Sequence, residues 1–304
     1  MIVLKKLIFA PLFLVFLVSL IYQIIPFLKS YDFIFSLSSD TLIQLLIISS
    51  LITLSSFSFI LFANLALDWK IILPIGFLTS LIPFIFMESS SAVVFMVGLL
   101  ISLLLVFIGL ETQMKSYLTF NPNSVLGPSI RHLSTLLIII ISIIYFLSVS
   151  KIVSEKGFQI PDSLIDTALK FSAPQEKPDE TSTPKLSIPK EQLDLLRKNP
   201  DLLKQSGLDP KILDTLDQPQ KDSGSLQTSL IKQTVKDQIQ SFLKPYLGFV
   251  PAILTVLLFF TLQSLTSILN LLIYPLLWIT FYILEKSGFV RFEVEQRPVK
   301  KMVL

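Results

Sequence analysis

Residues 133–150 read LSTLLIIIISIIYFLSVS and contain no charged side chain. A stretch of this length and apolarity is typical of a transmembrane helix, which needs roughly 20 apolar residues to cross about 30 Å of hydrocarbon. Inside the hydrocarbon every backbone N–H and C=O must be paired within the protein, and this requirement selects helices over open sheets. Earlier stretches of the same character cover residues 7–28, 41–67, 71–87 and 89–110. The sequence therefore predicts an all-α, polytopic membrane protein.

Charged residues are unevenly distributed along the chain. The 304 residues are 52% apolar and 15% charged, with a mean hydropathy of +0.72, whereas a soluble domain usually carries about 25% charge. Residues 1–150 and 245–284 hold few charges, while residues 151–244 have an ordinary soluble composition. We therefore expect an N-terminal membrane domain over residues 1–150, a hydrophilic segment over 151–244, a C-terminal membrane stretch over 245–284 and a basic tail over 285–304.

The positive charges between the hydrophobic stretches predict the orientation of the chain, because short cytoplasmic loops are enriched in Lys and Arg. If the N-terminus is cytoplasmic, the opposite side of the N-terminal domain carries Lys29 alone. The cytoplasmic side then carries Lys5, Lys6, Lys70, Lys115 and Arg131. Five crossings place residues 151–244 outside the cytoplasm. We expect the first stretch to be an uncleaved anchor, because no small-residue cleavage pattern follows it.

The C-terminal stretch is too long for one straight crossing. As a helix, residues 245–284 would extend roughly 60 Å, about twice the thickness of the hydrocarbon. One alternative is a hairpin that turns near residues 263–270 and gives seven crossings, but residues 261–267 contain no Gly or Pro for a turn. A hairpin would also place the basic tail outside, against the positive-inside rule. We favour six crossings with a cytoplasmic C-terminus, the last by a long helix kinked at Pro251 or Pro275.

The hydrophilic segment combines linker-like and helical patterns. Residues 172–189 are rich in Pro, Glu, Lys, Ser and Thr, a composition that predicts a disordered linker. Residues 190–216 contain Asn-Pro and Asp-Pro pairs of the kind that begin short helices. Amphipathic spacing predicts helices over residues 162–171 and 226–244. Two interpretations of residues 190–216 stay open: a loosely ordered segment, or a small helical cluster that docks on the membrane domain, a second copy or a partner.

Polar positions within the hydrophobic stretches are the candidates for a functional site. No ionisable side chain lies inside a stretch, and this disfavours proton-coupled transport and intramembrane hydrolysis. The candidates are Ser49, Thr53, Ser56, Asn64, Gln263 and Asn270. They would line a polar path or bind a ligand, or else they pack helices together through small side chains and hydrogen bonds. We favour packing for both groups.

Other reactive chemistry is sparse in the sequence. The chain has no cysteine, which excludes disulfides and thiolate metal sites. His132 is the only histidine, so a zinc site has no donor set. We therefore predict no catalytic residue, no cofactor and no metal site. The turn residues of segment 120–130, FNPNSVLGPSI, predict a shaped cytoplasmic loop that connects two helices.

These patterns favour a non-enzymatic integral protein of the cell membrane that acts as a scaffold, assembly factor or sensor through residues 151–244. The expected partners are the lipid bilayer and a membrane protein or second copy bound by that segment. A net charge of +3 is too small to suggest nucleic acid. The alternative is a transporter or channel without intramembrane ionisable groups. Only nine glycines and no GxxxG pair occur in the chain, which disfavours that alternative.

Overall fold

The computed structural model describes residues 6–35, 38–116, 121–158 and 244–290, and the elements in these ranges are helices. Contacts divide the chain into one unit of residues 1–151 and 252–304 and another of residues 152–251. Six helical spans are long and apolar enough to cross a membrane. They are Ala10–Lys29, Ser39–Ala66, Trp69–Phe86, Ser89–Lys115, Pro122–Glu155 and Pro245–Lys286. The predicted all-α polytopic fold is confirmed.

The first two spans form an extensive helix pair. Helix α2 (Ala10–Lys29) and helix α4 (Ser39–Ala66) are joined through the short α3 (Asp32–Phe35) and pack along their lengths. The rings of Phe13 and Phe59 meet between them, with centroids 5.2 Å apart. Because lipid is as apolar as these side chains, close packing of this kind, rather than escape from water, holds the two helices together.

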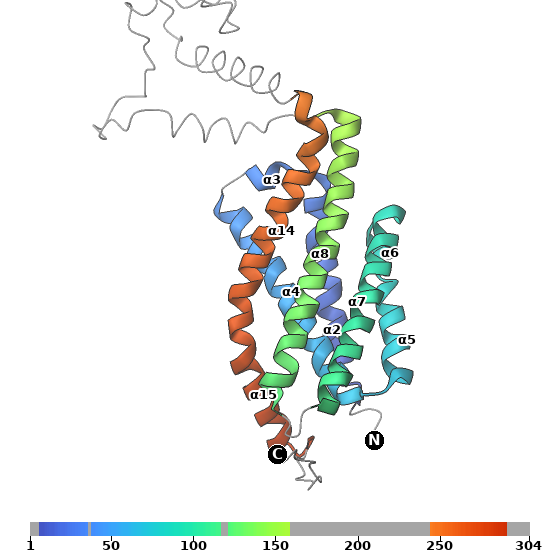
Figure 1. The fold of residues 1–304 in the computed structure, drawn as a ribbon, viewed down its shortest axis with the longest axis vertical. Coiled ribbons are helices and arrows are strands. Elements are labelled where there is room, and N and C mark those ends of the chain that lie inside the picture. The colour runs from blue at the N-terminus through green and yellow to red at the C-terminus, as the bar shows by residue number, and fades with distance from the viewer. Residues whose placement is uncertain (1–5, 36–37, 117–120, 159–243, 291–304) are drawn as a thin grey trace, which may run out of the picture. The chain divides into compact units, whose positions relative to one another are not determined.

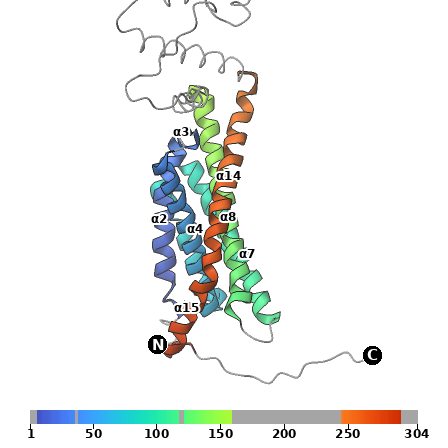
Figure 2. The same ribbon diagram turned by 90° about the vertical axis from the view of Figure 1, so that its left-hand side faces the viewer.

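Helix α4 lies in the middle of the first unit. It contacts α2, the short helix α5 (Trp69–Ser80) and α7 (Ser89–Ser116), and Figures 1 and 2 show it between α2 and the C-terminal helices. From Ile52 to its end almost every residue is buried. A helix that is covered on all sides has no solvent-facing stripe, and α4 accordingly places small serines among its large apolar residues. Its position makes α4 the centre of the bundle.

The third and fourth spans form an antiparallel pair. Asp68 caps the start of α5 by accepting a hydrogen bond from the Lys70 backbone N–H at 3.0 Å. The predicted stretch 71–87 is interrupted before α6 (Pro83–Phe86), because Pro83 has no N–H to continue the helical ladder. Both α5 and α6 pack against α7. The edge of the Trp69 ring meets Phe107 of α7, with centroids 4.6 Å apart.

Helix α8 (Pro122–Lys156) corrects the prediction of a loop over residues 120–130. The helix begins well before the apolar run, because Asn121 caps it through a hydrogen bond from the Asn123 N–H at 3.1 Å and Pro122 occupies the first helical position. Val125 and Leu126 are fully buried, so tertiary packing retains these first turns despite a glycine and a proline. At the other end, Gly157 has a φ of +72° and supplies the left-handed C-cap.

The C-terminal stretch continues in one direction and does not form the hairpin of the seven-crossing alternative. It consists of η1 (Lys244–Phe249), α14 (Val250–Leu269), η2 (Asn270–Leu272) and α15 (Ile273–Lys286). Figures 1 and 2 show α14 and α15 following each other along the bundle. The irregular turn η2 lies one turn before Pro275, whose ring disfavours a regular helix at that point. The start of α2 and the end of α15 therefore lie at the same end.

Predictions for the hydrophilic segment fall on residues that the structure does not describe. This applies to the linker over 172–189, the short helices of 190–216, the amphipathic helix over 162–171 and nearly all of the one over 226–244. The second unit is described at its two ends, by the last turn of α8 and by η1. Sequence composition therefore stays the basis for what we expect of these residues.

Candidate functional site

Charged side chains mark one boundary of an apolar slab. Lys151 of α8 forms an ion pair with Glu88 at the start of α7, with 2.9 Å between Nζ and Oε2. Arg131 and Lys151 lie about 20 residues apart on α8, or roughly 30 Å at 1.5 Å per residue. This distance matches the thickness of bilayer hydrocarbon. We therefore place Lys151 and Glu88 at one headgroup level and Arg131 at the other.

At the second boundary, aromatic side chains form hydrogen bonds with the charged side chains. Glu111 of α7 accepts hydrogen bonds from Lys115 Nζ at 2.8 Å and from the Trp69 indole N–H at 3.3 Å. Arg131 donates a hydrogen bond to the Tyr274 hydroxyl of α15, and its Cζ lies 5.0 Å from the centre of that ring. Aromatic side chains with a polar handle are enriched at such interfaces.

The candidate residues of α4 lie inside the bundle rather than along an open path. Ser49 and Ser56 are fully buried, and Thr53 and Asn64 are at most 9% exposed. The hydroxyls of Thr53 and Ser56 donate to backbone carbonyls one turn earlier, at 3.0 and 2.9 Å, which satisfies them within their own helix. Ser49 Oγ and Asn64 Oδ1 are buried without a hydrogen-bond partner among the described residues.

The C-terminal candidates lie on one face of α14 and η2. Asn270 is 9% exposed, and Gln263 is half-buried. Thr266 lies between them and is fully buried. A carbonyl or hydroxyl oxygen of each has no hydrogen-bond partner among the described residues. The described hydrogen bonds do not join this group to the polar residues of α4.

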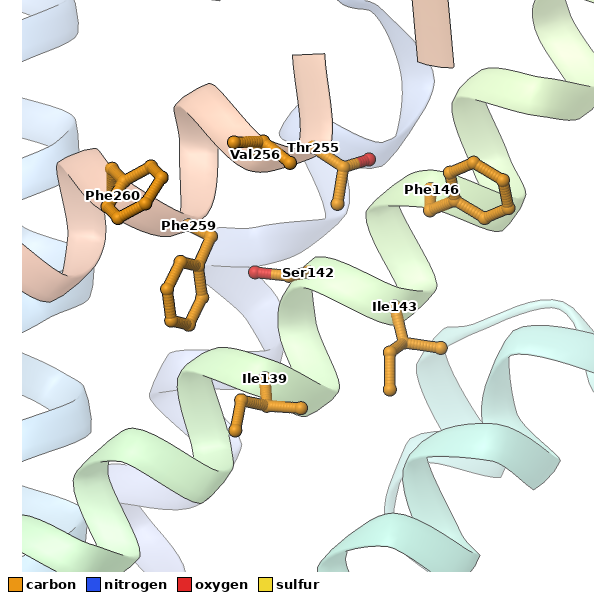
Figure 3. A pocket seen from close by; sticks show the side chains of 8 residues that line it. All are labelled: Ile139, Ser142, Ile143, Phe146, Thr255, Val256, Phe259 and Phe260. Carbon is orange, nitrogen blue, oxygen red and sulfur yellow. The ribbon is translucent and has the colours of Figure 1, made fainter. Parts of the chain in front are cut away.

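Sequence reasoning missed further buried polar groups on α8, among them those of Ser142 and Tyr145. Ser142 Oγ and the Tyr145 hydroxyl have no hydrogen-bond partner among the described residues. Ser142 lies in an apolar groove of about 510 Å³ between α8 and α14, which Figure 3 shows lined by residues of both helices. Ser142 lies seven residues after Thr135 and therefore on the same face of the helix. This spacing of two polar residues is the weak sequence signal that could have indicated the position.

A second groove combines apolar and polar lining and lies between α7 and α8. It has a volume of about 550 Å³ and contains Arg131 and His132, the only histidine. A smaller cavity of about 270 Å³ lies between the start of α8 and α15. Within the described ranges, no three His, Asp or Glu side chains gather where a metal ion would bind.

The fold and these charge levels define the class of the protein as a multi-pass α-helical membrane protein. Its six spans carry ionised groups at their ends and apolar side chains between. Comparison with protein-family models, with curated proteins and with solved structures finds no match to this chain.

Proposed function

We propose that this protein is a non-enzymatic scaffold, assembly or sensory protein of the cell membrane, which presents residues 151–244 outside the cytoplasm. The observation that supports the proposal best is the length of the two spans that bracket this segment. Helix α8 has 35 residues and the last span has 42, or roughly 52 and 63 Å. A crossing needs about 30 Å. Both spans are therefore longer than one crossing. Helix α8 continues past Lys151 to Lys156, and the last span begins at Pro245, so helical structure borders the segment at both of its ends.

The distribution of charge supports the orientation in this proposal. The start of α2 and the end of α15 lie with the Arg131 level, where the start of α5 and the end of α7 contribute Lys70 and Lys115. The opposite level pairs Lys151 with Glu88. A surplus of Lys and Arg in short connections is typical of the cytoplasmic side. We infer that the N- and C-termini are cytoplasmic.

A transporter or channel is the second candidate, and one observation favours it. The side-chain oxygens of Asn64 and Asn270 are buried without a hydrogen-bond partner among the described residues. Such atoms are uncommon in the interior of native proteins. They would suit the passage of a polar solute through the bundle. In this second function residues 151–244 need not bind a protein, and a binding test on that segment separates the two candidates.

Photocrosslinking in intact cells tests the scaffold proposal. A photoreactive amino acid at Ser163 or Ser206 is expected to give a discrete crosslinked product, either with a second, differently tagged copy or with one membrane protein. The matched control is the same amino acid at Ile85, which is 76% exposed on the lipid-facing surface and should capture lipid alone. If the two segment positions yield no polypeptide product while the protein is fully inserted, the scaffold proposal is wrong and the transporter gains support.

A further inference from the structure

The groove between α7 and α8 has an apolar half and a polar half. Leu105, Val106 and Leu136 line the first half, toward the middle of the apolar slab. The polar half is formed by Gln113, Ser129, Arg131, His132 and Thr135. We propose that this groove, which we call the α7–α8 groove, binds one anionic phospholipid, with its phosphate on Arg131 and an acyl chain along the apolar half. This inference is independent of the scaffold proposal.

The shape of the groove suits an acyl chain because its floor is open at Gly109. A Cβ atom added at Gly109 would have no neighbour within 4 Å, whereas one added at Gly98, about three turns away on the same helix, would lie 2.8 Å from Ile140 Cγ1. The two helices are therefore in close contact at Gly98 and separate toward Gly109. Leu105, one turn from Gly109, is 56% exposed. A flexible hydrocarbon chain fits such a wedge between helices.

The charge of the groove is positive because Arg131 is not neutralised within the described residues. The described ion pairs join Lys115 to Glu111 and Lys151 to Glu88, and neither includes Arg131. Glu111, at the same end of α7, is engaged by Lys115 and Trp69 and does not line the groove. Arg131 thus presents a positive charge to an anionic ligand.

Tyr274 holds the guanidinium of Arg131 in position. It accepts one hydrogen bond through its hydroxyl, and its ring lies 5.0 Å from Cζ. A guanidinium has five N–H donors in a fixed plane and binds phosphate oxygens through two of them at once. Donors other than the one used by Tyr274 can bind a phosphate. Ser129 Oγ, which donates to Gln113 Oε1 at 3.3 Å, closes the groove between α7 and α8 at this level.

The depth of Arg131 matches that of a lipid phosphate. It stands directly before the apolar run of α8, at the end of a slab of about 30 Å. The headgroup phosphate of a phospholipid lies at this boundary, and its acyl chains enter the slab where Leu105 and Leu136 line the groove. Basic pockets between transmembrane helices commonly bind anionic lipid headgroups. A lipid therefore satisfies both halves of the groove at once.

Native mass spectrometry of the purified full-length protein tests this proposal. Dioleoyl phosphatidylglycerol and dioleoyl phosphatidylcholine are supplied in equal amounts, so that the two lipids differ only in their headgroups. Both lipids carry a phosphate that Arg131 can bind, but the choline of phosphatidylcholine adds a positive charge near the guanidinium. The wild type is therefore expected to retain one phosphatidylglycerol with about a tenfold preference. Arg131→Gln is expected to reduce this preference to below about twofold. Gly109→Phe fills the apolar half and should reduce retention of both lipids at this site.

Matched variants distinguish binding in the groove from attraction of the anionic lipid to any exposed positive charge. Lys70→Gln removes an exposed charge at the same end of the helices and is expected to leave the preference unchanged. Tyr274→Phe keeps the ring beside Arg131 and should retain most of it. The proposal is overturned if the wild type shows no preference, if Lys70→Gln lowers it as much as Arg131→Gln, or if excess inorganic phosphate displaces the lipid. If Arg131→Gln unfolds the protein, the result for Gly109→Phe decides.

Discussion

Replacing Ser56 with aspartate is expected to prevent the protein from accumulating as a folded membrane bundle. Ser56 is fully buried in the middle of α4 and its hydroxyl is satisfied by the Ile52 carbonyl at 2.9 Å. A carboxylate at this place has no cationic partner within its span. At the centre of a membrane helix it costs about 3 kcal/mol in insertion alone. Loss of packing around α4 adds to that cost, against a total stability of about 5–15 kcal/mol.

Two control variants isolate the effect of the charge at Ser56. Ser56→Ala removes only the bond to the backbone of the same helix and is expected to change stability by less than about 1 kcal/mol. Ser39→Asp places the same carboxylate in the exposed first turn of α4, where the helix dipole favours it. The measurement is the yield of monodisperse protein by size-exclusion chromatography, with thermal melting of what is recovered. Normal yield of Ser56→Asp contradicts a buried α4.

Replacing Gly98 with alanine or leucine is expected to loosen the contact between α7 and α8. An added Cβ lies 2.8 Å from Ile140 Cγ1, closer than two such carbon atoms approach, and 3.2 Å from Cδ1, which is a tight contact. Ile140 is itself 5% exposed and cannot move aside freely. Overpacking of this kind costs about 1–3 kcal/mol, and the effect should grow from alanine to leucine. Thermal melting in a mild detergent measures it.

A double-mutant cycle shows whether the loss at Gly98 arises from Ile140. Ile140→Ala removes the three side-chain atoms that the new Cβ would meet. The loss of stability in the double variant Gly98→Ala, Ile140→Ala should be smaller than the sum of the losses in the two single variants, by about 1 kcal/mol or more. Gly109→Ala is the matched control on α7, since nothing lies within 4 Å of its Cβ position. Equal destabilisation by Gly98→Ala and Gly109→Ala would contradict the packing described.

The spans could be predicted from the sequence because the bilayer imposes one requirement on all of them. A run such as residues 133–150 must pair its backbone internally and exclude charge, so length and composition suffice. The start of α8 could not be predicted in this way. Its first turns, near Val125 and Leu126, are polar or turn-like in sequence and are helical because they are buried against other elements. Asn121-Pro122 matches the pattern of a capping residue before a proline at the first helical position, and this pattern would have indicated a helix start.

The buried polar residues could be found in the sequence, but their hydrogen-bond partners could not be predicted from it. Their presence in α4 and in the C-terminal stretch was visible, and a packing role was the favoured interpretation. The hydrogen bonds of Thr53 and Ser56 to their own backbone agree with that interpretation for two of them, while the unpaired oxygens of Asn64 and Asn270 leave the alternative open. The contact between Arg131 and Tyr274 joins residues 143 positions apart, and no spacing rule connects such pairs.

Labelling of single cysteines tests the six-crossing arrangement most directly, because the chain has no cysteine of its own. Cysteines are introduced one at a time at Ser30, Ser154, Ser225, Ser287 and Leu304. A membrane-impermeant maleimide is then added to intact cells and, in parallel, to permeabilised cells. We expect Ser30, Ser154 and Ser225 to be labelled from outside, and Ser287 and Leu304 to be labelled only after permeabilisation. Labelling at Ser287 in intact cells, at the level seen for Ser225, would contradict a single crossing by the last span and the orientation built on it.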